Sequence, residues 1–172
     1  MSERKSIAAQ AAYRERSPAD EPAIRALAAS AYADSGLRDA VLAAPADAVS
    51  LVAELDGEVI GHILLAPVPG PERALALAPL AVLPAWRDMQ IGTELVRHAL
   101  ALALQRQWRS VFVFGQPDYY CRFGFKSHTA DGAQIACQGP RFLALELQQG
   151  ALAGWTGSLD YPQPFVDLVS PH

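Results

Sequence analysis

The stretch Leu80-Ala-Val-Leu-Pro-Ala-Trp-Arg-Asp-Met-Gln-Ile-Gly-Thr93 leads from a short apolar segment into the strongest helical pattern of the chain. From Ile91 to about Gln107, apolar residues recur on one broad helical face, at Ile91, Leu95, Val96, Ala99, Leu100 and Ala103, widened by Leu102 and Leu104. The following run, Ser110 to Phe114, is apolar without alternation, which is typical of a strand covered on both faces. A strand, tight turn, helix and strand of this size predict a parallel crossover unit from Leu83 to Phe114.

The strand before this turn, expected from about Arg73 to Leu83, changes its side-chain alternation at Ala78-Pro79. Large apolar residues fall on odd positions before this pair and on even positions after it, as Leu75, Leu77, Leu80 and Val82. One extra residue at the pair would return all of them to one face, and proline inside a strand is tolerated mainly at edges and bulges. We therefore predict a β-bulge at Ala78-Pro79, where backbone groups become free for a ligand.

Two helices are expected near the N-terminus. Ser17 to Asp20 has the composition of a helix start, with Asp20 as the cap and Pro22 in the first turn. Gly36 is expected to end this helix, and Leu37 to Ala44 is a candidate second helix.

The other predicted elements surround these helices and the crossover unit. Asp56-Gly57 suits the positive φ angles of a tight hairpin turn, and it separates the candidate strands Val49 to Leu55 and Glu58 to Val68. Further elements are expected at Ala11 to Tyr13 (strand), near Asp118 to Arg122 (helical turn), and near Phe125, Ile135 and Phe142 to Leu147 (strands). The tail, residues 150–172, holds Trp155, Tyr161 and Phe165 and is expected to be ordered, without an assignable pattern. Together these elements predict an α/β (α+β) fold, with a mixed central sheet of about six to seven strands and about four helices.

Composition limits the functional classes. A chain of 172 residues that is 51% hydrophobic and 19% charged can bury one sizeable core, so we expect a single domain over residues 1–172. A net charge of -4 offers no basic surface for nucleic acid or an anionic membrane. The polar start and the absence of a long apolar run predict a cytoplasmic protein without a signal peptide or membrane span. Cys121 and Cys137 fit neither a disulfide framework nor a CxxC metal site, and the four histidines are scattered, so no metal is expected.

The turn before the long helix is a candidate anion site. The first N–H groups of that helix converge on one spot, Arg87 adds a positive charge there, and Gly92 lets a ligand approach the backbone. Helix starts with a nearby arginine are common, so the turn alone is weak evidence. A nucleotide phosphate loop is excluded because Gly-Lys-[Ser/Thr] is missing, and a dinucleotide fingerprint is excluded because its glycines are missing.

A second candidate segment, Gly115-Gln-Pro-Asp-Tyr-Tyr-Cys-Arg-Phe-Gly-Phe125, follows the buried strand. Its aromatic residues are compatible with a loop packed on the core. They are equally compatible with chemistry, because a phenol near the end of a crossover unit can donate a proton to a departing thiolate.

In combination, these two segments resemble the GNAT superfamily of acetyltransferases. The likeness is to a bacterial branch with a strand like Leu77-Ala-Pro-Leu-Ala-Val-Leu-Pro84 and a later element like Pro117-Asp-Tyr-Tyr-Cys-Arg-Phe-Gly-Phe125. Gly61-His-Ile-Leu64 and Gly150-Ala-Leu-Ala-Gly154 with Tyr161 also resemble that branch, so the likeness covers nearly the whole chain. It implies a GNAT fold and acetyl-CoA as co-substrate.

The resemblance also implies a set of cofactor-binding positions. The backbone of Leu80, Ala81 and Val82 would bind the acyl carbonyl and the pantetheine arm of acetyl-CoA. The turn and helix start would cradle the pyrophosphate, through Arg87, Asp88, Met89, Gln90, Ile91, Gly92 and Thr93. Gln90 stands where the family usually has glycine, and a positive φ there would strain it.

Tyr120 matches the tyrosine that the family places four residues before the glycine of its Tyr-x-x-x-Gly-Phe element, so the resemblance implies that it protonates the CoA thiolate. Tyr119 is expected to pack or to line the cofactor site, and as an adjacent phenol it could substitute for Tyr120 if the turn were rotated. Arg122 either reaches a phosphate or is solvated.

The expected reaction is transfer of an acetyl group from acetyl-CoA to a primary amine of a small molecule or protein by direct attack. The amine must be neutral to attack, and the sequence offers only water, Glu54 or His62 for its deprotonation. An acyl-enzyme at Cys121 is less favoured because no histidine adjoins it in sequence. The alternative function is a non-catalytic acyl-CoA-binding or partner-binding module with the same fold. The acceptor pocket is expected near residues 31–37 and the tail, and both a monomer and a homodimer fit the sequence.

Overall fold

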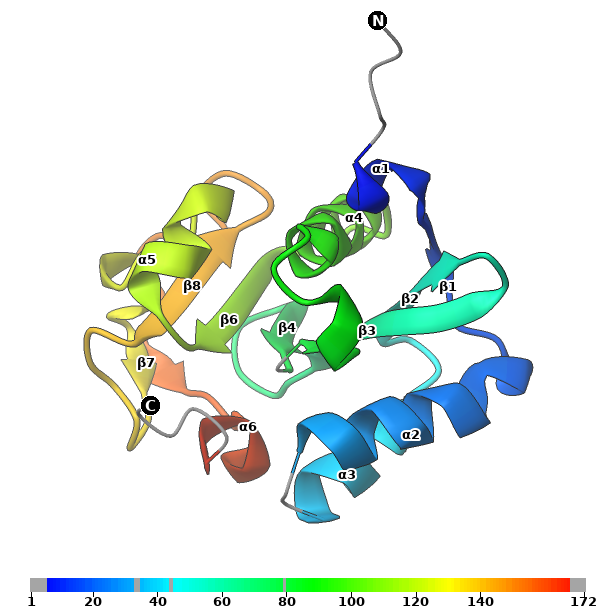
Figure 1. Ribbon diagram of the computed structural model, residues 1–172. Helices are drawn as coiled ribbons and strands as arrows, with labels where there is room; N and C mark the ends of the chain where they lie inside the picture. The colour runs from blue at the N-terminus through cyan, green and yellow to red at the C-terminus, as the bar shows by residue number, and fades with distance from the viewer. Residues whose placement is uncertain (1–5, 33–34, 44, 79, 168–172) are drawn as a thin grey trace, which may run out of the picture.

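The computed structural model describes residues 6–32, 35–43, 45–78 and 80–167 (Figure 1). The strands in these ranges are β1 (Ala12–Glu15), β2 (Val49–Leu55), β3 (Glu58–Pro67), β4 (Ala74–Leu77), β5 (Ala81–Val82), β6 (Ser110–Phe114), β7 (Ala133–Gln134), β8 (Phe142–Glu146) and β9 (Gly157–Ser158). The α-helices are α1 (Ile7–Gln10), α2 (Glu21–Ala31), α3 (Ser35–Leu42), α4 (Ile91–Gln105), α5 (Pro117–Tyr120) and α6 (Gln163–Asp167). Short 3₁₀ helices are η1 (Pro18–Asp20), η2 (Pro84–Trp86), η3 (Cys121–Phe123) and η4 (His128–Ala130).

A seven-stranded mixed sheet forms the centre of the molecule, in the order β1-β2-β3-β4-β6-β8, with β5 also paired to β3. The pair β4 and β6 is parallel, and the other pairs in this sheet are antiparallel. Helices α1 and α4 lie on one side of the sheet, while α2, α3 and α6 lie on the other (Figure 1). The predicted α/β architecture, with six to seven strands, is therefore confirmed. The parallel pair joined through α4 confirms the predicted crossover unit.

Two apolar cores sandwich the sheet. The core on the α4 side joins the buried face of that helix, including Leu95, Val96 and Ala99, to strand residues such as Leu65 and Leu75. The core on the α2 side contains Phe112 and Phe142 of the sheet, together with residues of α2, α3 and the C-terminal segment. Strand β6 contributes to both cores, which explains its unbroken apolar sequence.

The hairpin of β2 and β3 forms as predicted. Asp56 has φ 50° and Gly57 has φ 79°, so both turn residues are left-handed, and Leu55 pairs with Glu58 across them. The turn matches the right-handed twist of the strands.

The third predicted strand is divided by a change of register. Leu65 and His62 are three positions apart on β3, whereas their partners Leu77 and Ala81 are four positions apart. One extra residue therefore lies between β4 and β5, as the predicted bulge requires; Pro79 itself lies outside the described residues. The large apolar residues on both sides of the shift, Leu75, Leu77, Leu80 and Val82, all face the α4-side core.

Several predicted boundaries are wrong. Helix α2 ends at Ala31, where Tyr32 turns to extended angles and buries its ring, so Gly36 does not end α2 and instead lies inside α3. Asp20 makes no side-chain cap on α2; its carboxylate accepts hydrogen bonds from Ser17 N and from Arg14 instead. Six α-helices are seen in the described ranges, against about four predicted, because α1 and α6 are too short to give a periodic pattern. The predicted helical turn near Asp118 to Arg122 forms as α5 and η3. Near Phe125 only a single bridge forms, between Lys126 and Ala144.

A part-buried ion-pair network ties β1 to η1 and β2. Arg14 donates to both carboxylate oxygens of Asp20, at 2.7 and 2.9 Å, and its Nε donates to Glu54 at 2.8 Å. The Arg14 guanidinium holds the pKa of Asp20 well below its usual range, even though burial acts in the opposite direction.

We expect Asp20→Asn to lower the free energy of unfolding by about 1 to 3 kcal/mol at pH 7, because charge-assisted hydrogen bonds are lost. The lowered pKa means that the ionised carboxylate stabilises the fold above the unfolded-state pKa of about 4, and this contribution declines as the pH falls below it. Urea unfolding at several pH values measures the difference between wild type and variant, which should narrow in acid.

The matched control is Glu21→Gln, which removes the exposed pair between Glu21 and Arg25 and should change the unfolding free energy by less than about 0.5 kcal/mol. Equal stability of the two variants would contradict the role assigned to Asp20.

Candidate functional site

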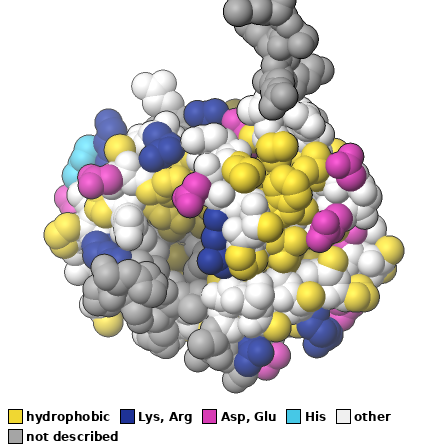
Figure 2. Space-filling view, viewed as in Figure 1, with side chains coloured by type: hydrophobic (Ala, Val, Ile, Leu, Met, Phe, Trp, Pro, Cys, Tyr) yellow, Lys and Arg dark blue, Asp and Glu magenta, His cyan; other side chains and the backbone are white. Residues whose placement is uncertain are grey.

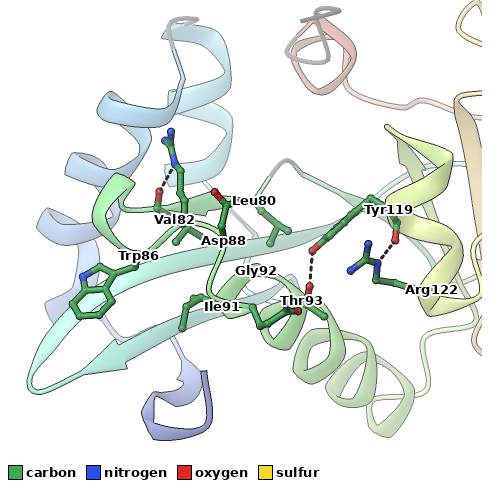
Figure 3. Close-up of a pocket in the computed structure, with 11 residues that line it drawn as sticks. Leu80, Val82, Trp86, Asp88, Ile91, Gly92, Thr93, Tyr119 and Arg122 are labelled. Carbon is green, nitrogen blue, oxygen red and sulfur yellow. Dashed lines mark hydrogen bonds between the residues drawn. The ribbon is translucent and has the colours of Figure 1, made fainter. Parts of the chain in front are cut away.

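The central sheet forks at the carboxyl ends of its two parallel strands. β4 and β6 pair from Ala74 and Ser110 as far as Ala76 and Phe112. Beyond that point β5 follows β3, while the end of β6 follows β8. The register shift before β5 therefore leaves the β5 edge that faces β6 unpaired in the described sheet. The N-terminus of α4 lies beside this edge (Figure 3).

A cavity of about 420 Å³ occupies this position. Its lining consists of Leu80, Val82, Trp86, Arg87, Asp88, Gln90, Ile91, Gly92, Thr93, Tyr119 and Arg122 (Figure 3). The structure thus brings together ten of the twelve residues predicted to bind the cofactor. The other two lie elsewhere: Ala81 points into the α2-side core, and Met89 is exposed outside the cavity.

Trp86 lines the cavity and was not predicted. It lies half-buried in η2, against the α4-side core. The only sequence signal for it is an aromatic residue in the turn between the bulged strand and the helix.

The turn before α4 is held in an unusual backbone conformation. Asp88 and Gln90 have φ 61° and 68°, in the left-handed region that favours glycine. Gln90 adopts the left-handed backbone conformation that a glycine would adopt without strain, and this costs about 1 to 2 kcal/mol of conformational free energy. No side chain caps the N-terminus of α4, so its first N–H groups remain available to a ligand. Gly92 has no side chain that could block these N–H groups. A Cβ at this position would lie 3.3 Å from Cδ1 of Leu80 and 3.7 Å from the hydroxyl of Tyr119.

Two arginines border the same cavity. Arg87 donates through Nε to the carbonyl of Val82 at 3.2 Å. Arg122 donates through Nε to the carbonyl of Tyr119 at 2.8 Å, and its guanidinium lies 4.5 Å from the centre of the Tyr119 ring. An uncapped helix N-terminus with two guanidinium groups is suited to a phosphate or pyrophosphate. Charged side chains of both signs are interspersed over the face seen in Figure 2, so the positive character is local.

The adjacent tyrosines have different surroundings. Tyr119 lines the cavity, and its hydroxyl lies 3.2 Å from Oγ1 of Thr93. This contact joins α5 to the start of α4. Tyr120 lies behind it with its ring packed on Phe125, and its hydroxyl has no hydrogen-bond partner among the described residues. Burial, and secondarily Tyr119, raise the pKa of Tyr120 above its ordinary value, so the phenol stays protonated at neutral pH.

Gly115 makes room for Tyr120. A Cβ at Gly115 would lie 2.5 Å from Cε2 and 3.1 Å from Cδ2 of the Tyr120 ring. A side chain there would displace the ring, so the position of the phenol depends on this glycine. Tyr120 is also close enough to Tyr32, on the α2 side, to raise the pKa of Tyr32, although burial is the larger cause.

The candidate bases are already engaged. Nε2 of His62 lies 2.8 Å from Oγ of Ser50, and burial lowers the pKa of His62 to about 3. Glu54 accepts from Arg14. Cys121, the candidate residue for an acyl-enzyme, is exposed, and its thiol donates to the carbonyl of Asp118 at 3.4 Å. None of these groups lines the cavity.

The described ranges contain no cluster of three or more His, Cys, Asp or Glu side chains suited to a metal ion. None of the helices there has the length and apolar character needed to span a membrane.

The chain as a whole is similar to known proteins. Residues 9–125 match the model of the Acetyltransferase (GNAT) family. The uncharacterized N-acetyltransferase YjhQ of Escherichia coli K12 is 34% identical over 90 residues, and this chain spans 49% of its length. The uncharacterized N-acetyltransferase YhbS of the same strain is 31% identical over 117 residues, covering 64% of this chain and 69% of YhbS.

Solved structures agree with these sequence matches. The crystal structure of Escherichia coli YhbS in complex with CoA has a TM-score of 0.81 and 25% identity, covering 96% of this chain and 95% of that one. A GNAT family acetyltransferase from Brucella melitensis in complex with acetyl-CoA has a TM-score of 0.70 and 29% identity, covering 90% and 97%. The fold predicted from the sequence is therefore confirmed.

The strained turn gives a prediction with a built-in control. Gln90→Gly should raise the free energy of unfolding by about 0.5 to 1 kcal/mol, because relief of left-handed strain outweighs the added chain entropy. Gln107, at the other end of α4, has φ 67° and is also exposed, so Gln107→Gly should give a similar gain. Denaturant titration measures both.

Only Gln90 lines the cavity, so the two variants should differ in ligand binding. With CoA as the probe, calorimetry should find binding by Gln90→Gly at least as tight as by wild type, because the backbone N–H geometry is retained. Loss of CoA binding in Gln90→Gly, with Gln107→Gly unaffected, would show instead that the glutamine side chain itself is required.

Proposed function

This chain belongs to the GNAT family of acetyltransferases, and we propose that it transfers an acetyl group from acetyl-CoA to a primary amine by direct attack. The observation that carries the proposal is the cavity that joins the uncapped N-terminus of α4 to the unpaired edge of β5. We also propose that residues 1–172 form one acyltransferase domain, because helices on both sides pack against the same seven-stranded sheet.

The donor set of the cavity fits the pyrophosphate of acetyl-CoA. The first N–H groups of α4 carry partial positive charge, and Arg87 and Arg122 add two full charges at the same cavity. Gly92 leaves the space that a phosphate oxygen needs in order to approach the backbone. Tyr119 and Trp86 would flank the bound cofactor as aromatic walls.

The edge of β5 fits the pantetheine arm. Ala81 and Val82 use one edge of their strand to pair with His62 and Gly61 of β3. The opposite edge faces the fork, where an amide of pantetheine can pair with it as an added strand would. Because Ala81 acts through its backbone here, its buried side chain is compatible with this role. A backbone N–H of the same segment is available to polarise the thioester carbonyl.

In the proposed reaction the amine nitrogen attacks the thioester carbonyl carbon, forming the C–N bond. Collapse of the tetrahedral intermediate breaks the C–S bond, and the sulfur leaves with the electron pair. Tyr120 then gives its proton to the thiolate. Burial raises the pKa of the phenol, so it holds its proton at neutral pH until the thiolate forms.

The amine loses its proton without help from the predicted bases. His62, with its pKa lowered to about 3, is a weak proton acceptor, and Glu54 is paired with Arg14. We propose that water accepts the proton. The rate should therefore rise with pH as the fraction of neutral amine increases.

A second candidate function is a non-catalytic acyl-CoA-binding or partner-binding module. The strained Gln90 and the engaged bases favour it. Calorimetry that detects acetyl-CoA binding, combined with no release of CoA across a broad panel of amines, would support this alternative.

Replacement of the phenol tests the enzymatic proposal. Tyr120→Phe should lower kcat by about 100-fold or more, with little change in acetyl-CoA affinity, because only the proton donor is removed. Release of CoA thiol with an accepted amine measures kcat, and calorimetry measures affinity. Tyr119→Phe, which loses the contact with Thr93, should act mainly on acetyl-CoA affinity.

Tyr13→Phe is the control, since it removes a half-buried phenol that donates to the carbonyl of Ala8, outside the cavity. An unchanged kcat in Tyr120→Phe would exclude Tyr120 as the proton donor.

A further inference from the structure

Tyr161 reaches the fork from the C-terminal segment, between β9 and α6. Its side chain is buried and packs edge-on against Phe142 and Phe165, with ring centres 5.5 and 5.9 Å apart. The hydroxyl accepts a hydrogen bond from the N–H of Phe114 on β6 at 3.1 Å. It donates to the carbonyl of Leu77 on β4 at 3.2 Å. One side chain therefore connects the two strands where they diverge.

These two backbone groups are those that would form the next rung of the parallel ladder. Ser110 N donates to the carbonyl of Arg73 where β6 begins. In a parallel pair such bonds recur every two residues along each strand, so the series would continue from Phe112 to Leu75 and from Phe114 to Leu77. At the last of these positions the Tyr161 hydroxyl stands between donor and acceptor. Two hydrogen bonds in series replace a single backbone bond of about 2.9 Å.

From this geometry we propose that Tyr161 is a positioning residue that keeps the β4–β6 fork open for the acyl-pantetheine arm. The hydroxyl satisfies both strand groups without letting the strands meet. A phenol has one proton to donate, and here that proton is used on Leu77, so Tyr161 does not supply the proton for the thiolate. The inference rests on the proposed acetyl-CoA function of the same fork.

Both sides of the fork depend on this contact. Leu77 directly precedes the bulge that turns β5 toward the cavity. Phe114 directly precedes Gly115, against which the Tyr120 ring packs. Tyr161 therefore sets the spacing between the strand expected to hold the acyl group and the phenol expected to protonate the thiolate.

The segment that carries Tyr161 is itself anchored. Asp160 N donates to the carbonyl of Pro69 at 3.0 Å, and Leu159 packs against Gly70. Burial raises the pKa of Tyr161 well above its ordinary value, so the hydroxyl keeps its proton, and both hydrogen bonds, across the physiological pH range.

The test compares two probes that share the nucleotide but differ in the arm. Acetyl-CoA enters the fork, whereas 3′-phospho-ADP, its nucleotide half, reaches only the helix N-terminus. Calorimetry on Tyr161→Phe should find acetyl-CoA binding weakened about tenfold, which corresponds to about 1.4 kcal/mol, with 3′-phospho-ADP binding unchanged. Thermal unfolding confirms that the variant is folded. Tyr13→Phe, which loses a comparable hydroxyl-to-carbonyl bond at the β1 edge of the sheet, should leave both affinities unchanged.

Two outcomes would overturn the proposal: unchanged binding of both probes by Tyr161→Phe, or equal weakening of both, which would indicate a general effect on stability. Failure of the proposed function is distinguishable, because wild-type protein would then bind neither probe or release no CoA. A wild type that binds and turns over acetyl-CoA, with Tyr161→Phe indistinguishable from it, would refute only the role of Tyr161.

Discussion

Between β4 and β5 the chain gains one residue relative to β3, and this register shift is the constraint on which the site depends. A strand that stays in register would continue along β6 and close the sheet. The extra residue lets β5 keep its hydrogen bonds to β3 while it leaves β6. One strand edge is thereby left unpaired in the interior of the described sheet, and such an edge is a binding surface for an extended ligand.

The other parts of the site are arranged around that opening. The chain from β5 returns through η2 and two left-handed residues, Asp88 and Gln90, so that α4 begins with its N-terminus beside the fork. The α4-side core fixes the helix there through Leu95, Val96 and Ala99. Across the fork, β6 leads into Gly115 and α5, which hold the two tyrosines. Backbone strain at Gln90 and steric room at Gly115 thus serve the same purpose, the placement of donors around one cavity.

The sequence was sufficient for the elements with a strong local signal. Helical periodicity located α4, Asp56-Gly57 located the hairpin, and the change of alternation at Ala78-Pro79 located the register shift. It failed where the signal is short or overridden. Two helices, α1 of four residues and α6 of five, have no measurable period. Gly36 was assigned to a helix end on propensity, but the chain leaves α2 earlier because Tyr32 is buried at its C-terminus. Asp20 has the composition of a helix cap, but its carboxylate instead binds Arg14 from another element.

What the sequence determined by itself is therefore the order of the elements, the irregular strand and the turn before α4, since each depends on residues close together in the chain. Resemblance to a family added candidate roles for Tyr120 and the residues of that turn. Only the tertiary structure decided that Trp86 joins the cavity, that Gly115 receives the ring of Tyr120, and that Tyr161 reaches the carbonyl of Leu77, 84 residues away. These contacts depend on how the sheet and the C-terminal segment pack in three dimensions, and no local periodicity records that packing.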